Sequence, residues 1–249
     1  MKDFLQQRTS IRKYKKEHIS DETLEYILKA SVRASNCGNM QLYSFIITKD
    51  EEKKKAYAPL HFNQPMITGA DVVITVCADI NRFNHWCEIS SADKSLNNFL
   101  FLNIATIDAT IAAQAITTAA ESKGLGVCWL GTVNYMVDEI SKFFNLPKGV
   151  VPVACLTIGV PDEKPELTER LPLSAIVHNE SYKDYTDEDI RQMYKQIEDN
   201  PTNKEFVKEN NLETLAQVFS QVRYAKKGNE EFSERFLRFV KENFVDSKI

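Results

Sequence analysis

The sequence predicts a sheet flanked by helices, of the α/β or α+β class. Residues 70–78 and 151–160 are apolar, β-branched runs of strand length, which is typical of buried strands. Residues 98–123 form a much longer segment that is apolar or small almost all round. Helical and strand segments alternate along the chain, and this alternation favours a sheet covered by helices.

The N-terminal part should begin with a helix that Ser20 caps and that runs to about residue 32. Acidic residues lie in the first turn of this helix, and Leu24, Ile27 and Leu28 lie on one face. The further elements expected before residue 96 are a loop over 33–41, a strand over 45–48, a short charged helix from 49–52, a loop over 61–65, the strand 70–78 and a polar, irregular stretch over 79–95.

The segment 98–123 is the longest predicted helix, and Gly124 supplies its C-terminal cap. A helix that is apolar on every side must be buried on every side. In a chain of 249 residues, one route to such burial is the interface of an oligomer. The elements expected after it are a strand over 127–131, a helix over 137–144 and the strand 151–160.

The last third of the chain changes in character. Residues 161–178 are proline-rich and extended, and the segment from residue 180 onward is charged and helical. We therefore expect a single domain, 1–249, in which residues 180–249 form a helical C-terminal extension that packs on the body or on a partner subunit. The apolar residues that mark its last amphipathic helix are Phe232, Phe236, Phe239 and Val240.

Composition excludes several classes of protein. The net charge of −4 argues against a nucleic-acid-binding protein, and the first seven residues contain no apolar signal-peptide core. The five cysteines are odd in number and have neither CxxC nor zinc spacing. We expect a cytoplasmic protein with no metal site, no nucleic-acid partner and no membrane span. Three cysteines lie in apolar runs and should be buried: Cys77, Cys128 and Cys155.

No standard catalytic motif is present. The sequence lacks the GxGxxG, GxxxxGK[ST] and GxSxG patterns, which mark dinucleotide, phosphate-loop and hydrolase sites. Asp108 and Glu121 lie thirteen residues apart in the long helix, so we interpret them as polar or capping residues rather than an acid–base pair. The four histidines are scattered and are expected to be surface or locally bonded residues: His18, His61, His85 and His178.

One N-terminal stretch has the composition of an anion site. Arg8 and Arg12 bracket the hydroxyls of Thr9 and Ser10, and arginine presents a fork of donors that matches phosphate or carboxylate. The alternative is a basic surface segment that leads into the first helix. Three other segments supply amides and small residues: the loop around Asn36, the loop of Asn63 and the stretch SKGLGVCWLG. Together these groups suit a ligand with one anionic end and a flat polar ring, unless the loops are ordinary ones.

Five motifs in order resemble the FMN-dependent nitroreductase superfamily, and within it the oxygen-insensitive NADPH nitroreductase and flavin reductase branch. They are RTSIRKY, ADVVITVCAD, AAESKGLGVCWLG, FFNLPKGVVPVACLTIGVP and ERLPLSAIVHNESY, and the likeness covers residues 4–185. The resemblance implies an α+β fold with a mixed sheet and an obligate homodimer with the long helix in its interface. It also implies an FMN cofactor reduced by NADPH or NADH.

The resemblance also implies the site residues. No side chain is expected to be catalytic, because the cofactor carries the chemistry. Arg223 is a candidate contact for the nicotinamide nucleotide. Three departures stand out: Thr168 replaces a usual lysine, Thr132 a frequent glycine, and Trp129 a usual tyrosine. The expected FMN-binding residues are Arg8, Thr9, Ser10, Arg12, Asn36, Asn63, Trp129, Leu130, Gly131 and Arg170.

The function that the resemblance implies is NAD(P)H oxidation coupled to reduction of nitroaromatics, quinones or free flavin. The two half-reactions would share one site in ping-pong order. The alternatives are another FMN enzyme of the same fold, of the reductive dehalogenase type, or a non-enzymatic flavin-binding protein.

Overall fold

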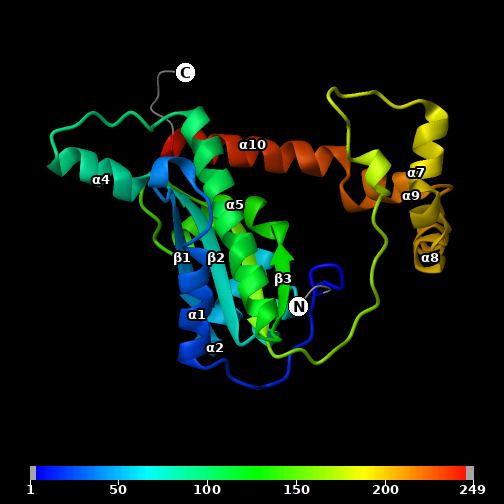
Figure 1. The fold of residues 1–249 in the computed structure, drawn as a ribbon, viewed down its shortest axis with the longest axis horizontal. Helices are drawn as coiled ribbons and strands as arrows, with labels where there is room; N and C mark the ends of the chain where they lie inside the picture. Colours follow the sequence, from blue (N-terminus) through cyan, green and yellow to red (C-terminus); the bar gives the residue numbers. More distant parts are fainter. Residues whose placement is uncertain (1–3, 245–249) are drawn as a thin grey trace. The chain divides into compact units, whose positions relative to one another are not determined.

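The structure is a computed structural model that describes residues 4–244. Its contacts separate two compact units (Figure 1). The main unit contains the chain up to residue 165 and the segment from 232, and the helical unit is Glu166–Glu231. The helical unit thus begins before the residue 180 that the sequence suggested. That the units act as one domain stays a prediction.

The main unit is built on a four-stranded sheet with the order β1-β2-β4-β3. This arrangement confirms the α+β class. All three strand pairings are antiparallel, so the expected mixed sheet is wrong for the described residues. The connections between strands are long enough to allow either direction, which is why the sequence did not decide it. The strands are β1 Tyr43–Thr48, β2 Val72–Asp79, β3 Gly126–Leu130 and β4 Val150–Gly159.

The long helix α5, Phe99–Ser122, packs against the sheet together with α1 (Figure 1). Asn98 caps it, and Ala109, Ala112 and Ile116 join the core that contains alternate residues of β2. By length and composition α5 is also apolar enough to cross a membrane. Its packing on the sheet identifies it as the core helix, with an apolar face left exposed.

The remaining helices of the main unit cover the other face and the ends of the sheet. A second core joins α2 and α6 to β2 and β4 through residues such as Tyr57 and Ile140. One prediction was wrong: the stretch 79–95 contains helix α4, Asn81–Ile89. It forms because the Asp79 carboxylate accepts hydrogen bonds from the first amides of the helix. The other helices are α1 Asp21–Ser31, α2 Glu51–Tyr57, α3 Met66–Gly69, α6 Val137–Phe143 and the segment of α10 (Lys226–Asn243) from Phe232.

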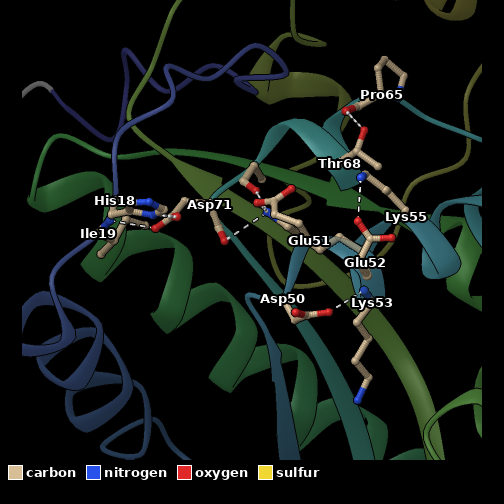
Figure 2. Close-up of polar contacts among 12 residues, drawn as sticks. His18, Ile19, Asp50, Glu51, Glu52, Lys53, Lys55, Pro65, Thr68 and Asp71 are labelled. Atoms are coloured by element: carbon tan, nitrogen blue, oxygen red, sulfur yellow. Dashed lines mark hydrogen bonds and ion pairs between the residues drawn. The ribbon is translucent and has the colours of Figure 1, made fainter.

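Asp71, just before β2, ties the N-terminal segment to the sheet. Figure 2 shows its carboxylate contacting His18 and Ile19. Oδ1 lies 2.7 Å from His18 Nδ1, and Oδ2 accepts a hydrogen bond from Ile19 N at 2.7 Å. The buried Lys54 of α2 donates to the Ala70 carbonyl at 2.6 Å, beside the same turn. These contacts fix where the chain enters α1.

Residues 11–15 run along the edge formed by β3 and the end of β4. Ile11 N donates to the Val127 carbonyl at 3.1 Å, and Lys15 N donates to the Val160 carbonyl at 2.9 Å. This approach requires a glycine on β3, because a Cβ at Gly126 would lie 2.6 Å from the Ile11 side chain. The predicted anion cradle, residues 8–12, is thereby placed next to β3.

The helical unit confirms the prediction of a charged helical region. Thr186 caps α7 in a capping box, and Asn200 caps α8. A π-helical turn, Val218–Arg223, precedes the last helix. The helices of this unit are α7 Asp187–Asp199, α8 Pro201–Glu209, α9 Leu215–Gln217 and the beginning of α10.

Candidate cofactor site

The predicted cradle brings two arginines together beside β3. The charges of Arg12 and Arg8 both act to lower the pKa of the Cys128 thiol on β3, although burial raises that pKa overall. The hydroxyls of Thr9 and Ser10 are half-buried, and among the described residues neither has a hydrogen-bond partner. Two guanidinium groups and two unengaged hydroxyls therefore share one short segment. This donor set fits a phosphate group.

Arg8 is held by a carboxylate that the sequence analysis did not assign to the site. Its Nε lies 3.0 Å from Oε1 of Glu121, in the last turn of α5. The exposed fractions of the two side chains are 24% and 12%. Burial raises the pKa of Glu121, and the positive charge of Arg8 opposes that shift. The prediction that Glu121 is only a polar or capping residue is therefore incomplete.

Arg12 is fixed through its backbone, and its side chain is exposed. Glu163 Oε1 accepts hydrogen bonds from Arg12 N at 2.5 Å and from Lys13 N at 3.0 Å. Tyr14 anchors the same segment, because its hydroxyl donates to the Ile11 carbonyl at 2.6 Å and lies 2.8 Å from Thr157 Oγ1. Burial raises the pKa of Tyr14, so this phenol stays neutral.

The end of β3 carries the three residues expected along the flavin ring. Trp129 donates its indole N–H to Thr117 Oγ1 of α5 at 2.8 Å, so its ring is fixed against the core. Leu130 is buried, whereas Gly131 is exposed. A Cβ added at Gly131 would meet no heavy atom within 4 Å. The backbone of Gly131 therefore borders open space, as a flat ligand requires.

Asn63 is brought toward this strand end by its neighbour His61. Asn63 itself is exposed and has the left-handed φ of 55°. His61 Nδ1 lies 2.6 Å from Thr132 Oγ1, and both side chains are buried. Burial lowers the pKa of His61 to about 4. This contact joins the 3₁₀ turns Ala58–His61 and Gly131–Asn134, and no spacing pattern in the sequence indicates it.

Asn36 lies apart from the cradle within one chain. Its side chain is used locally, since Oδ1 accepts a hydrogen bond from Gln41 N at 3.2 Å. The next residue, Cys37, donates its N–H to Asp108 Oδ1 at 2.9 Å, at the middle of α5. Asp108 and Glu121 are separated by about 20 Å along the helix axis, at 1.5 Å per residue. Asn36 borders a groove of about 330 Å³ whose floor is the exposed apolar face of α5.

Two predicted residues belong to the helical unit. Arg170 Nη1 donates to Thr168 Oγ1 at 2.6 Å, so Thr168 contacts the arginine that we expect to bind the phosphate. The Arg223 guanidinium lies over the ring of Phe206, 4.6 Å from its centroid. Their roles toward a cofactor or a nucleotide stay predictions.

Sequence comparison decides the family. The pattern of the Nitroreductase family matches residues 5–160, which is more than half of the chain. The chain belongs to the nitroreductase family. It is 32% identical over 181 residues to the FMN reductase (NADPH) of Bacillus subtilis, covering 72% of this chain and 73% of that protein.

Two further relatives support this membership of the nitroreductase family. The chain is 32% identical over 174 residues to the oxygen-insensitive NADPH nitroreductase of Salmonella typhimurium, covering 70% of this chain and 71% of that protein. A crystal structure from Bacteroides fragilis matches with a TM-score of 0.96 at 44% identity, covering 98% of this chain and 100% of the other. These likenesses span both the sheet and, for the crystal structure, the helical unit.

Proposed function

We propose that this nitroreductase-family chain is an FMN-dependent NAD(P)H oxidoreductase that reduces nitroaromatics, quinones or free flavin. The observation that carries the proposal is that the cradle of Arg8 and Arg12 lies against β3 near Cys128, on the strand that is followed by the open backbone of Gly131. An anion site on a strand that leads to an open backbone suits a flavin mononucleotide. Bound there, FMN would supply the hydride chemistry.

The chain's own residues bind and orient the cofactor in this proposal. The cradle would hold the phosphate and ribityl chain, and the end of β3 would lie along the ring, with no catalytic side chain. Arg223 would contact the nicotinamide nucleotide. The residues that we propose to bind FMN are Arg8, Thr9, Ser10, Arg12, Asn36, Asn63, Trp129, Leu130, Gly131 and Arg170.

The proposed enzyme is a homodimer. Ile107 and Ile111 on α5 are 50% and 40% exposed in the single chain, which is unusual for a helix otherwise packed in the core. In the proposed dimer, a second copy that covers this face would bring its Asn36 loop toward the cofactor and would account for the separation of Asn36 from the cradle. The five free cysteines support our placement of the enzyme in the cytoplasm.

The test is to purify the protein, record its flavin absorbance and measure NADPH and NADH oxidation with a nitroaromatic or a quinone. We expect bound FMN and acceptor-dependent oxidation. A colourless protein that binds no added FMN would contradict the proposal. FMN binding without NAD(P)H oxidation would instead favour a non-enzymatic flavin-binding role. Comparing the rates of flavin bleaching by the two nucleotides identifies the preferred donor.

A further inference from the structure

The carboxylate of Glu121 lies where its negative charge is destabilised. It lies in the last turn of α5, where the helix dipole is negative and destabilises a negative charge. Its side chain is only 12% exposed, and its Oε2 is buried without a hydrogen-bond partner among the described residues. A buried carboxylate with an unsatisfied oxygen destabilises the fold unless another interaction offsets the cost. The described contact that can do so is with Arg8.

The geometry of that contact leaves part of Arg8 available. Glu121 Oε1 approaches Nε at 3.0 Å. The contact is an ion pair, because Nε has no hydrogen-bond partner among the described residues, and neither Nη1 nor Nη2 of Arg8 forms a hydrogen bond there. A guanidinium group has five donors, and the pair at its end forms the fork that binds phosphate with two parallel hydrogen bonds. Arg8 is therefore held from the side, with its terminal fork unused.

The local charges still attract an anion after this pairing. Glu121 offsets the charge of Arg8, but the exposed Arg12 guanidinium acts on the same Cys128 thiol and adds a second positive charge. Glu163 bonds to the backbone N–H groups of Arg12 and Lys13 and not to the Arg12 side chain. The carboxylates near the cradle thus fix its backbone and one arginine, and the Arg12 side chain contacts the Cys128 thiol rather than a carboxylate.

We propose that Glu121 is a positioning residue that holds Arg8 by Nε and aims its terminal fork at the phosphate of the flavin nucleotide. This inference rests on the proposed function, because it assumes that the cradle binds that phosphate. It assigns to α5 a second role beside core packing, since the end of the helix supports the anion site. Side-chain freedom that Arg8 would otherwise lose on binding is already restricted before the ligand arrives.

Two variants separate the position of the charge from its presence. Glu121→Asp keeps the negative charge but shortens the side chain by one methylene group, which withdraws the carboxylate from Arg8 Nε. Glu121→Gln keeps the length and removes the charge, and it shows the effect of the charge alone. The full-length protein is freed of flavin by dialysis, and its dissociation constants for FMN and for riboflavin, which lacks the phosphate, are measured by flavin fluorescence. Thermal unfolding of both variants checks that they fold.

We expect the Asp variant to bind FMN several-fold more weakly than the wild type, because the ion pair that orients Arg8 is weakened while the net charge is unchanged. The Asp variant and the wild type should bind riboflavin equally. Equal FMN affinities would overturn the inference, and so would an equal loss for both flavins, which would indicate a merely structural role. A wild-type protein that binds FMN no more tightly than riboflavin would overturn the proposed phosphate site itself, and the inference with it.

Arg8→Lys provides the decision if the Asp variant does not fold. A single ammonium group can pair with Glu121 or bind the phosphate, but it lacks a separate Nε and fork. We expect this variant to lose most of the preference for FMN over riboflavin. An unchanged ratio of the two dissociation constants would overturn the positioning role.

Discussion

His61 Nδ1 lies 2.6 Å from Thr132 Oγ1, and this contact joins two turns that carry predicted cofactor residues. His61 is fully buried, and its Nε2 has no hydrogen-bond partner among the described residues. An uncompensated charge at this place would be costly, so the imidazole is neutral near pH 7. The contact therefore has consequences for stability at low pH and for the shape of the site.

The first prediction concerns acid stability. Burial lowers the pKa of His61 to about 4, whereas an unfolded chain has the ordinary value of 6.5. Between these values the unfolded state binds a proton that the folded state does not, so the free energy of unfolding falls as the pH falls from 6.5 to 4. The loss amounts to about 3 kcal/mol at 1.36 kcal/mol per pKa unit. Urea unfolding at a series of pH values measures it.

His61→Gln is the control for this titration, because glutamine can hydrogen-bond to Thr132 but does not titrate. The difference in unfolding free energy between wild type and variant should shift with pH only below about 6.5. A pH-independent difference would show that His61 does not cause the acid sensitivity.

The second prediction concerns Thr132, whose hydroxyl contacts His61. Thr132→Val keeps the shape but leaves His61 Nδ1 buried without a partner, which should lower the free energy of unfolding by about 1–3 kcal/mol. Thr132→Ser retains the hydroxyl and should lose less. Chemical denaturation compares the three proteins, and equal stabilities for Ser and Val would argue against the hydrogen bond.

The elements that the sequence predicts correctly are those whose pattern lies in residues next to one another in the chain. The Ser20 cap is confirmed by the hydrogen bond from Thr23 N to Ser20 Oγ at 3.1 Å, and the residues involved are neighbours in the chain. The buried strands are predicted correctly because a run of consecutive apolar residues can be read from the sequence without knowledge of the neighbouring strands. Helix α4 is missed because its sequence is polar and the carboxylate that accepts its first amides belongs to Asp79, the last residue of β2.

Long-range pairs explain what the sequence could not reveal about the site. His61 and Thr132 are 71 residues apart, and no spacing rule connects them. The residue types around Arg8 predict an anion site. Its partner Glu121 lies on a helix whose apolar sequence predicts core packing, so the sequence does not indicate a role for Glu121 at that site. The direction of strand pairing likewise depends on connections that the residue pattern does not specify. Residue types thus predict the hydrogen-bond donors of the site. The residues that hold these donors in place can be identified only from the fold.

The third prediction tests the close approach of the N-terminal segment to β3. A Cβ at Gly126 would lie 2.6 Å from Ile11 Cβ, which is too near the backbone of that residue to move aside cheaply. Gly126→Ala should lower the free energy of unfolding by about 1–3 kcal/mol and weaken FMN binding, since it displaces the cradle. Gly69→Ala, where no atom lies within 4 Å, is the control and should neither lower the free energy of unfolding nor weaken FMN binding. Thermal unfolding and flavin titration distinguish the two variants.

The fourth prediction tests the exposed face of α5. Ile111→Lys places a charge on the surface that the proposed dimer buries, and an unpaired buried charge strongly opposes association. We expect a shift from dimer to monomer in light scattering, together with weaker FMN retention. Ile111→Val keeps the face apolar and should remain dimeric. A dimeric lysine variant would place the interface elsewhere.

The last prediction separates the cradle from a general basic surface. Arg12→Ala removes an exposed guanidinium but not the backbone hydrogen bond to Glu163, so the fold should stay intact. Loss of one charge-assisted contact to phosphate should weaken FMN binding roughly tenfold or more. Lys13→Ala removes a neighbouring positive charge whose backbone N–H is held by the same carboxylate, and it should change FMN affinity far less. Flavin titrations at two salt concentrations make the comparison, because a diffuse charge effect is screened by salt and a direct contact is screened less. Equal losses for the two variants, abolished at high salt, would mean that residues 8–13 attract the nucleotide without binding its phosphate.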